Sequence, residues 1–244
     1  MGGRHHGPLP DGRLDNLNTY WTLVRRAHGQ TPDAALEARN ELLRRYHGAA
    51  YRYLLAVVRD PDAADELSQE FALKFLRGDF RHAQPERGRF RDYLRASLAH
   101  LVRSHRRREV RRPESLPADP PETEAGGEDH AFRSAWRETL LVHTWAELER
   151  VEHQTGAPVH TVLRFRVDHP ELSSPELAEQ LSNRLGKPLN AVAVRQALHR
   201  ARKKFAALLV EAVAGSLDRP TREQLLDELA ELNLLSYCRS AVDR

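Results

Sequence analysis

The chain has 244 residues, with 38 Lys and Arg against 35 Asp and Glu, and its formal net charge is +3. This length suggests one large domain or two small ones. The single cysteine, Cys238, excludes a disulfide framework within the chain. No apolar run approaches the roughly 18–20 residues of a membrane span. Strand formers are sparse and Leu, Ala, Arg and Glu are abundant, so the composition favours an all-α fold.

The chain begins with a Gly-, His- and Pro-rich stretch, and residues 1–18 are expected to form a flexible tail. This stretch has no apolar core, so we expect no signal peptide. A first helical domain is predicted over residues 19–112. Its helices are separated by Asp60-Pro61 and by the Gly78–Gly88 stretch, which are helix stops. The predicted helices cover residues 33–58, 62–77 and 90–108.

The segment 62–77 has the pattern of an amphipathic helix. Leu67, Phe71 and Phe75 recur every four residues and form a stripe that should be buried. The polar residues of this segment lie on the other side. By itself the periodicity indicates only an ordinary amphipathic helix. The polar side chains in question are Glu66, Gln69, Glu70 and Lys74.

The segment 90–108 combines an apolar stripe with many arginines. The predicted core face is Phe90, Leu94, Leu98 and Leu101. The arginines left for solvent or phosphate would bind polyanions in a salt-dependent way. The aromatic residues Phe80, Phe90 and Tyr93 suit stacking on an unpaired base, although a place in the core is the ordinary alternative for each. The arginines are Arg91, Arg95, Arg103, Arg106, Arg107 and Arg108.

Residues 113–130 form an acidic stretch that is rich in Pro and Gly and contains no Lys or Arg. Such a composition cannot build a core, so we predict a disordered linker between two domains. Its negative charge is also expected to shield the neighbouring basic helices by attraction over roughly a Debye length of about 8–10 Å.

The second predicted domain, residues 131–215, contains a helix-turn-helix pattern. Ser174 is the expected N-cap of the first helix, with Pro175 at its first position. A break at 186–189 follows, and Asn190 is the expected N-cap of the second helix. The second helix has one apolar stripe and a basic, amide-bearing outer face, which suits the DNA major groove. The stripe consists of Val194, Leu198, Ala201, Phe205 and Leu208.

Residues 216–244 are predicted to add a C-terminal helical extension. Thr221 and Gln224 have capping-box spacing, and Leu225, Leu229 and Leu232 then mark one face of a final helix. Its apolar stripe should be covered, either by the second domain or by a regulator.

These motifs together resemble the bacterial RNA polymerase sigma factors of the sigma-70 family. Asp65-Glu-Leu-Ser-Gln-Glu-Phe71, then Phe90-Arg-Asp-Tyr-Leu94 and the arginine run, resemble region 2 of the short, two-domain extracytoplasmic-function (ECF) group. The phrase Ala193-Val-Arg-Gln-Ala-Leu-His-Arg-Ala-Arg-Lys-Lys-Phe205 is similar to region 4 of that group. Two features depart from the family: Tyr93 replaces a common Trp, and residues 182–189 lengthen the first helix or the turn by a few residues.

The resemblance implies a promoter-specific transcription initiation factor made of a region 2-like bundle and a region 4-like helix-turn-helix joined by a flexible acidic linker. The implied contacts with the clamp helices of the largest catalytic subunit of core polymerase are Asp65, Glu66, Gln69, Glu70 and Lys74. The implied contacts with the melted −10 strand are Phe80, Arg89, Arg91, Tyr93, Arg95, Arg103, Arg106 and Arg107. The implied contacts with double-stranded DNA at the −35 element are Asn190, Arg195, Gln196, His199, Arg200, Arg202 and Lys203.

The resemblance also implies a cytoplasmic protein, associated with the nucleoid in the holoenzyme and not inserted in a membrane, with an anti-sigma factor or other regulator as an open partner. We expect no catalytic residues, no metal site and no cofactor, since the sequence lacks Gly-rich phosphate loops and zinc-type Cys pairs. Three alternatives remain. The first is a helix-turn-helix regulator that does not bind core polymerase, and the second is an interaction protein that has lost DNA reading. A phosphotransfer or nuclease enzyme is the third and most distant.

Overall fold

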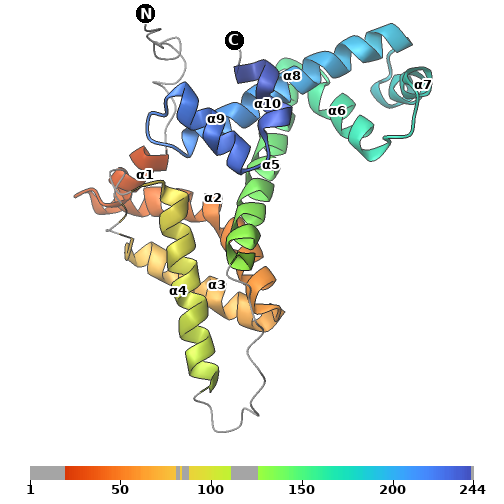
Figure 1. Cartoon of the computed structure of the whole chain (residues 1–244). Coiled ribbons are helices and arrows are strands. Elements are labelled where there is room, and N and C mark those ends of the chain that lie inside the picture. The colour runs from red at the N-terminus through yellow and green to blue at the C-terminus, as the bar shows by residue number, and fades with distance from the viewer. Residues whose placement is uncertain (1–19, 81–82, 84–87, 111–125, 243–244) are drawn as a thin grey trace, which may run out of the picture. The chain divides into compact units, whose positions relative to one another are not determined.

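The computed structural model describes residues 20–80, 83, 88–110 and 126–242, and for residues 20 and 240 it describes the backbone alone. Every regular element in these ranges is an α-helix, which confirms the predicted all-α class (Figure 1). None of the described helices is long and apolar enough to cross a membrane. The chain divides into two compact units. The first unit contains the described residues up to Thr139 together with Val213–Glu228, and the second contains Leu140–Ala212 together with the residues from Leu229 on.

The first unit is built around one long helix, α2 (Pro32–Val58), which contacts α1 (Tyr20–Ala27), α3 (Pro61–Arg77) and α4 (Phe90–Val110) (Figure 1). The Asp60 side chain accepts hydrogen bonds from the first backbone N–H groups of α3, with Pro61 at the first helical position. Gly78 ends α3 with φ +80°, a conformation that favours glycine. The three predicted helices are thus confirmed to within two residues at each end.

The core of this unit follows the predicted stripes. Phe90 is fully buried, and its ring lies edge-on to Trp21 at 5.8 Å and tilted against Tyr46 at 5.1 Å between centroids. Aromatic pairs in these arrangements add to the stability that area burial provides. The stripe residues that are buried as predicted are Leu67, Phe71, Phe75, Leu94, Leu98 and Leu101.

Arg39, in the N-terminal part of α2, connects the ends of two neighbouring helices. Its Nε donates to the Ala27 carbonyl at 3.0 Å, and its Nη1 donates to the Leu76 carbonyl at 3.1 Å. The last carbonyls of a helix have no partner within the helix. One guanidinium therefore serves the C-terminal ends of both α1 and α3.

Helix α5 (Gly127–Thr155) differs from the predicted domain boundary. The sequence predicts a disordered linker that includes residues 127–130, but these residues are helical, and the helix up to Thr139 belongs to the first unit. Phe132 packs edge-on against Tyr53 at 5.7 Å, and Trp136 stacks on Tyr46 at 5.3 Å. This apolar stripe needs the face of α2 for burial, which explains the shift of the boundary. The rest of the predicted linker, up to residue 125, and the predicted tail lie outside the described residues.

The second unit contains the rest of α5, then α6 (Val159–Asp168), α7 (Ser174–Leu185) and α8 up to Ala212 (the whole of α8 is Ala191–Gly215). The Glu152 carboxylate, near the end of α5, accepts from the Thr161 backbone N–H at 2.8 Å and from the Thr161 hydroxyl. A carboxylate at a helix N-terminus satisfies an unpaired N–H and complements the helix dipole. This contact fixes the connection between α5 and α6.

The C-terminal extension forms two helices, α9 (Arg222–Glu231) and α10 (Leu235–Val242), where the sequence predicts one. The predicted capping box is present: the Thr221 N–H donates to Gln224 Oε1 at 2.9 Å, and the Gln224 N–H donates to the Thr221 hydroxyl at 3.3 Å. Asn233, with φ +55°, separates the helices. In α10, Cys238 is fully buried, and this burial raises the pKa of its thiol to about 11.

Candidate nucleic-acid and partner interfaces

The polar face of α3 divides into an open part and a part that is engaged within the unit. Asp65, Glu66 and Gln69 are exposed. Glu70 accepts from Lys74 Nζ at 2.7 Å and from Arg108 Nη2, at the end of α4, at 3.0 Å. The hydrogen bond from Lys74, and then the one from Arg108, hold the pKa of the Glu70 carboxyl below its ordinary value. The structure therefore places all five predicted partner contacts on one helix and leaves the first three free to meet a partner.

Sequence reasoning gave no role to Leu73, which is 54% exposed on the same helix. It follows Gln69 by four residues and Glu66 by seven, so the three share one stripe of α3. The sequence does contain a signal for this exposed residue, because Leu73 does not lie on the apolar Leu67–Phe71–Phe75 stripe. An apolar side chain amid polar ones is a suitable centre for a protein contact.

The N-terminal part of α4 holds a buried ion pair that the sequence did not reveal. Arg91 is 3% exposed and Glu228, from α9, is 1% exposed; Arg91 Nε lies 3.0 Å from Glu228 Oε1. Arg89 also contacts Glu228, at 2.7 Å, and its Nε lies 2.8 Å from Asp92. The prediction that Arg91 faces DNA is therefore wrong, because this side chain lies at the edge of the buried stripe and a carboxylate distant in sequence neutralises it.

The position of Glu228 corrects part of the prediction for the C-terminal extension. From the sequence, its apolar helix is expected to pack on the second domain or to bind a regulator. The structure divides this helix: Val213–Glu228 belongs to the first unit, where Leu225 is buried and Asp218 lies 3.8 Å from Arg25, whereas the buried Leu229 and Leu232 belong to the second unit. The extension therefore supplies part of the bundle that carries α4.

The remaining arginines of α4 fall into two classes. Arg106 Nη1 lies 3.1 Å from Glu128 Oε1, and Arg95 forms an ion pair with Asp129. Both carboxylates come from the first turn of α5. Arg103 and Arg107, by contrast, have exposed side chains. Of the predicted −10 contacts on α4, these two are the most accessible to phosphate.

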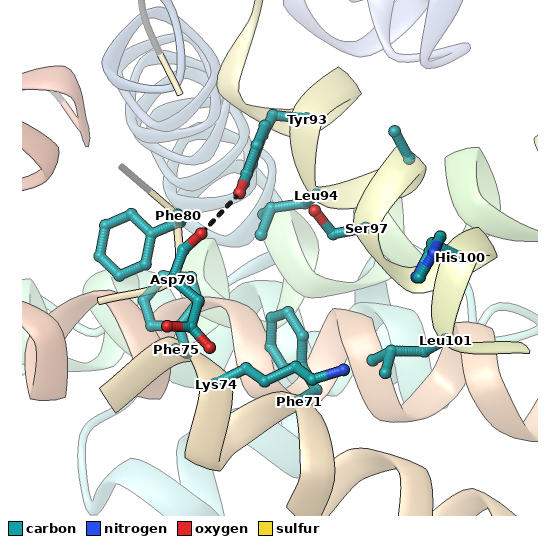
Figure 2. A pocket seen from close by; sticks show the side chains of 11 residues that line it. Phe71, Lys74, Phe75, Asp79, Phe80, Tyr93, Leu94, Ser97, His100 and Leu101 are labelled. Carbon is teal, nitrogen blue, oxygen red and sulfur yellow. Dashed lines mark hydrogen bonds between the residues drawn. The ribbon is translucent and has the colours of Figure 1, made fainter. Parts of the chain in front are cut away.

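A cavity of about 350 Å³ lies between α3 and α4 (Figure 2). Its walls are aromatic and apolar, and several polar groups reach it. The Tyr93 hydroxyl donates to the Asp79 carbonyl at 3.4 Å, and burial raises the pKa of Tyr93. Phe80 is 3% exposed and stacks on Phe75 at 4.3 Å, so it forms a wall of the cavity and is not a free stacking surface as predicted. The polar side chains at the cavity are Lys74, Asp79, Tyr93, Ser97 and His100.

Such a cavity has the properties of a site for one planar, polar ring. Aromatic walls offer stacking to a nucleobase, and hydroxyl, imidazole and ammonium groups offer hydrogen bonds to its edges. Tyr93, predicted from its place in the −10 motif, contributes to this cavity, whereas the sequence predicts Phe71 and Phe75 only as core.

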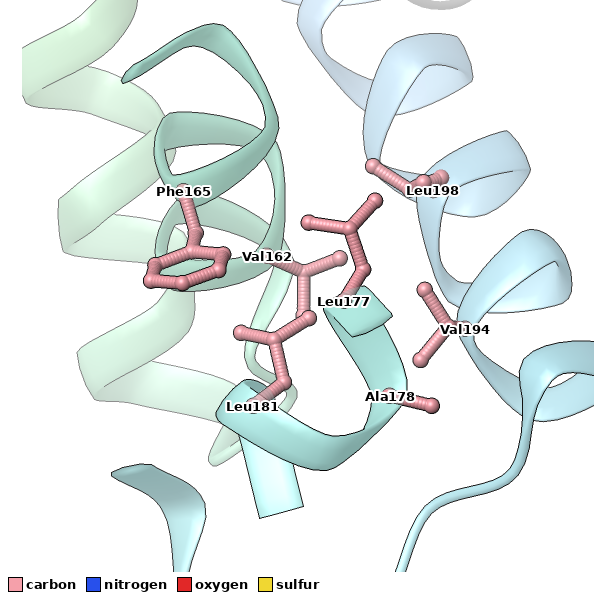
Figure 3. Close-up of a cluster of buried hydrophobic side chains, with 7 residues drawn as sticks. All are labelled: Val162, Phe165, Leu177, Ala178, Leu181, Val194 and Leu198. Carbon is pink, nitrogen blue, oxygen red and sulfur yellow. The ribbon is translucent and has the colours of Figure 1, made fainter. Parts of the chain in front are cut away.

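In the second unit, α7 and α8 are joined by a turn and pack with α6 around a buried cluster (Figure 3). The α7 N-cap is Ser173, one residue earlier than predicted, and its N–H donates to Glu176 Oε2 at 2.7 Å. Asn190 is confirmed as the cap of α8, because its Oδ1 accepts from the Ala193 N–H at 2.8 Å. The cluster consists of Val162, Phe165, Leu177, Ala178, Leu181, Val194 and Leu198.

The long turn between α7 and α8 is held by one side chain. The Ser182 hydroxyl donates to the Ala178 carbonyl at 2.6 Å and accepts from the Leu189 N–H at 2.8 Å. Gly186, with φ +62°, ends α7. These contacts fix the segment between Ser182 and Leu189, so the start of α8 has a defined position relative to α7.

The outer face of α8 is basic and open. Its predicted DNA contacts are exposed, and among the described residues no carboxylate lies within ion-pair distance of the cations. Asn190 is also exposed, but its side-chain oxygen is engaged in capping the helix. A packed inner face and an open, cationic outer face are the features of a recognition helix. The exposed residues are Arg195, Gln196, His199, Arg200, Arg202 and Lys203.

Comparison with known proteins gives one family match. Residues 42–112 match the family model of Sigma-70 region 2. A search of curated proteins and a search of solved structures gave no match. The matched segment begins within α2 and contains the whole of α3 and α4, with the polar face, the aromatic cavity and the basic helix. This chain therefore contains a sigma-70 region 2 domain.

Proposed function

We propose that the chain is a sigma factor of the ECF group, which binds core RNA polymerase and directs initiation at specific promoters. The observation that carries the proposal is the match of residues 42–112 to Sigma-70 region 2. The proposal is supported by the polar face of α3 and the basic, aromatic surface of α4 in that segment, which suit a protein partner and DNA. In this role the protein works in the cytoplasm, beside the nucleoid, and carries out no catalysis of its own.

Core polymerase binds the open part of α3 in this proposal. The carboxylates of Asp65 and Glu66 and the amide of Gln69 meet the clamp helices, and Leu73 adds an apolar contact among them. Glu70 and Lys74 support this face from the side through their ion pair. In the complex, Leu73 would lose its contact with water at the centre of the interface, and the polar side chains would surround it.

A charge reversal tests this face. Glu66→Lys combined with Leu73→Ala is expected to lower the retention of core polymerase at least tenfold, because it removes an attraction and an apolar contact together. Glu37→Lys, on an exposed position of α2, is the matched control for charge. Thermal unfolding of each variant verifies folding. Unchanged retention of core by a folded double variant would mean that α3 is not the docking helix.

The −10 element is read by the cavity and by α4. An unpaired base of the melted strand enters the cavity between α3 and α4, while Arg103 and Arg107 bind the strand's phosphates. Tyr93→Ala should weaken binding of a −10 single strand to the holoenzyme by about 1–3 kcal/mol through lost stacking. Tyr93→Phe keeps the ring, loses only the hydroxyl with its bonds to the Asp79 carbonyl and to Ser97, and should retain most of the affinity. Equal losses in both variants would contradict base stacking at this residue.

The second unit reads the −35 element with α8 in the major groove. Its support is the helix-turn-helix geometry, the open basic face, and the similarity of residues 193–205 to the region 4 signature. The early residues Arg195 and Gln196 reach base edges, and the later cations bind phosphates.

The decisive experiment adds the purified chain to core polymerase and maps transcription start sites. The proposal expects initiation at a defined set of promoters that core alone does not use. The alternative, a helix-turn-helix regulator independent of core, expects DNA binding by the chain but no new start sites. The region 2 match favours the first outcome, because a regulator of the second kind has no need of the polar face of α3.

A further inference from the structure

The basic helix of the region 2 domain is covered by acidic side chains from outside that domain's matched segment. Glu128 and Asp129 form the first turn of α5 and pair with Arg106 and Arg95 of α4. The matched segment ends at residue 112, so these carboxylates are contributed by this chain's own sequence beyond it. They occupy two of the guanidinium groups that the proposed function gives to DNA binding.

These ion pairs are partly exposed. The Arg95 and Asp129 side chains are 41% and 52% exposed, and those of Arg106 and Glu128 are 33% and 27% exposed. Ion pairs in such positions are weak, because water and salt screen them. A DNA phosphate can therefore replace the carboxylate at each guanidinium without leaving a buried charge unpaired.

The first turn of α5 is nevertheless held in place by its own hydrophobic anchors. Phe132 and Trp136 pack against Tyr53 and Tyr46 of α2, only one and two turns farther along the helix. Tethering of this kind gives the carboxylates a high effective concentration at α4. Their position at a helix N-terminus stabilises their negative charge further. The ion pairs are individually weak, but the packing of α5 keeps the two carboxylates beside Arg95 and Arg106.

We propose that the first turn of α5 is a built-in competitor for phosphate, which lowers the affinity of the free chain for DNA until DNA or polymerase displaces it from Arg95 and Arg106. The inference rests on the proposed role of α4 in DNA binding. It assigns a regulatory function to Glu128 and Asp129. Their carboxylates compete electrostatically with DNA phosphates for arginines of the region 2 domain.

The test measures binding of a mixed-sequence single-stranded DNA to the full chain by fluorescence anisotropy at several salt concentrations. Glu128→Gln with Asp129→Asn should raise the affinity by about two- to tenfold, because two guanidinium groups no longer have to be vacated. The salt dependence should steepen by roughly 0.7 for each additional phosphate that the variant neutralises. Adding Arg95→Ala and Arg106→Ala to this variant should abolish the rise in affinity.

A matched control separates the local effect from the change in net charge. Glu147→Gln with Asp168→Asn also removes two carboxylates and releases two arginines, since these residues pair with Arg150 and Arg164 in the second unit. A clearly smaller rise in affinity in this control supports the proposal, and an equal rise overturns it. Thermal unfolding checks folding; if the double variant unfolds, the single substitutions Glu128→Gln and Asp129→Asn test the same direction separately.

The result of the DNA-binding test does not depend on the result of the transcription experiment with core polymerase. If the chain directs promoter-specific initiation but the neutralised variant binds single-stranded DNA no better than the wild type, the competitor is refuted and the proposed function stands. If initiation fails while the neutralised variant binds more tightly, α4 is a covered DNA-binding surface and the assignment as a sigma factor is refuted.

Discussion

The two basic helices of this protein differ in how their charge is used. At α4, Arg91 and the preceding Arg89 pair with a buried carboxylate, and Arg95 and Arg106 pair with partly exposed ones. On α8, the described residues place no carboxylate beside the exposed arginines and lysine of the outer face. A similar density of positive charge therefore gives a largely neutralised helix in one unit and an open cationic face in the other.

The comparison teaches that a run of arginines does not by itself define a DNA-binding surface. Each guanidinium on α4 belongs to one of three environments: buried and paired, exposed and paired, or exposed and open. The first is structural, the second can exchange its carboxylate for phosphate, and the third is available at once. Mutations that act on one environment at a time can separate these roles.

The largest effect is expected at the buried pair. Glu228→Ala leaves Arg91 buried without its carboxylate and should lower the free energy of unfolding of the first unit by about 3–5 kcal/mol, since breaking one side of a buried pair leaves an uncompensated charge. Asp218→Ala removes a more exposed partner of Arg25 from the same segment and should cost less than about 1 kcal/mol. Urea denaturation measures both. A loss below that of the control would mean that Arg91 finds another partner easily.

A smaller effect is expected on α8, and it concerns binding instead of folding. Arg195→Ala or Gln196→Ala should cost about 1–3 kcal/mol at the preferred upstream element and relax its sequence preference. Lys203→Ala should weaken binding to all sequences alike and reduce the salt slope by about one. Promoter binding at two salt concentrations distinguishes them. Uniform losses for all three would make α8 a phosphate clamp and leave promoter choice to the −10 surface.

The smallest effect is expected at Glu70, between Lys74 and Arg108. Its pKa is lowered in the folded chain, so its contribution to stability is fully present above its ordinary pKa of 4.5 and is lost as the pH falls through the lower, folded value. Glu70→Gln should reduce stability at pH 7 by less than about 1 kcal/mol, and the difference from wild type should shrink below about pH 4. Thermal unfolding across this range checks it. A difference that persists in acid would indicate packing by the Glu70 stem.

Local pattern was sufficient for much of the fold. The stripes through Phe71 and Leu98 predicted which faces of α3 and α4 are buried, and the helix stop at Asp60-Pro61 and the cap at Asn190 are present. These features depend on residues within one or two helical turns of each other, so the sequence displays them directly.

The main features that the sequence did not reveal depend on distant partners. From the sequence Arg91 is expected at the surface, and only the fold brings Glu228 beside it. Likewise Phe132 and Trp136 are expected in a second domain, but they pack against Tyr53 and Tyr46 of α2. The candidate site was predicted in the same way: the motif identified Tyr93, but the cavity beside it forms only when α3 and α4 pack together. Pairings between remote segments set the domain boundary and decide which charges remain available.

The burial of Cys238 makes this molecule convenient for site-directed labelling. With a pKa of about 11, roughly one thiol in ten thousand is ionised at pH 7, and the thiolate is the form that maleimides and disulfide reagents attack. A cysteine introduced at an exposed position, such as that of Arg103 on α4 or His199 on α8, should therefore react selectively without removal of the native one. Dyes placed in this way would report the distance between α4 and α8 when the proposed partners bind.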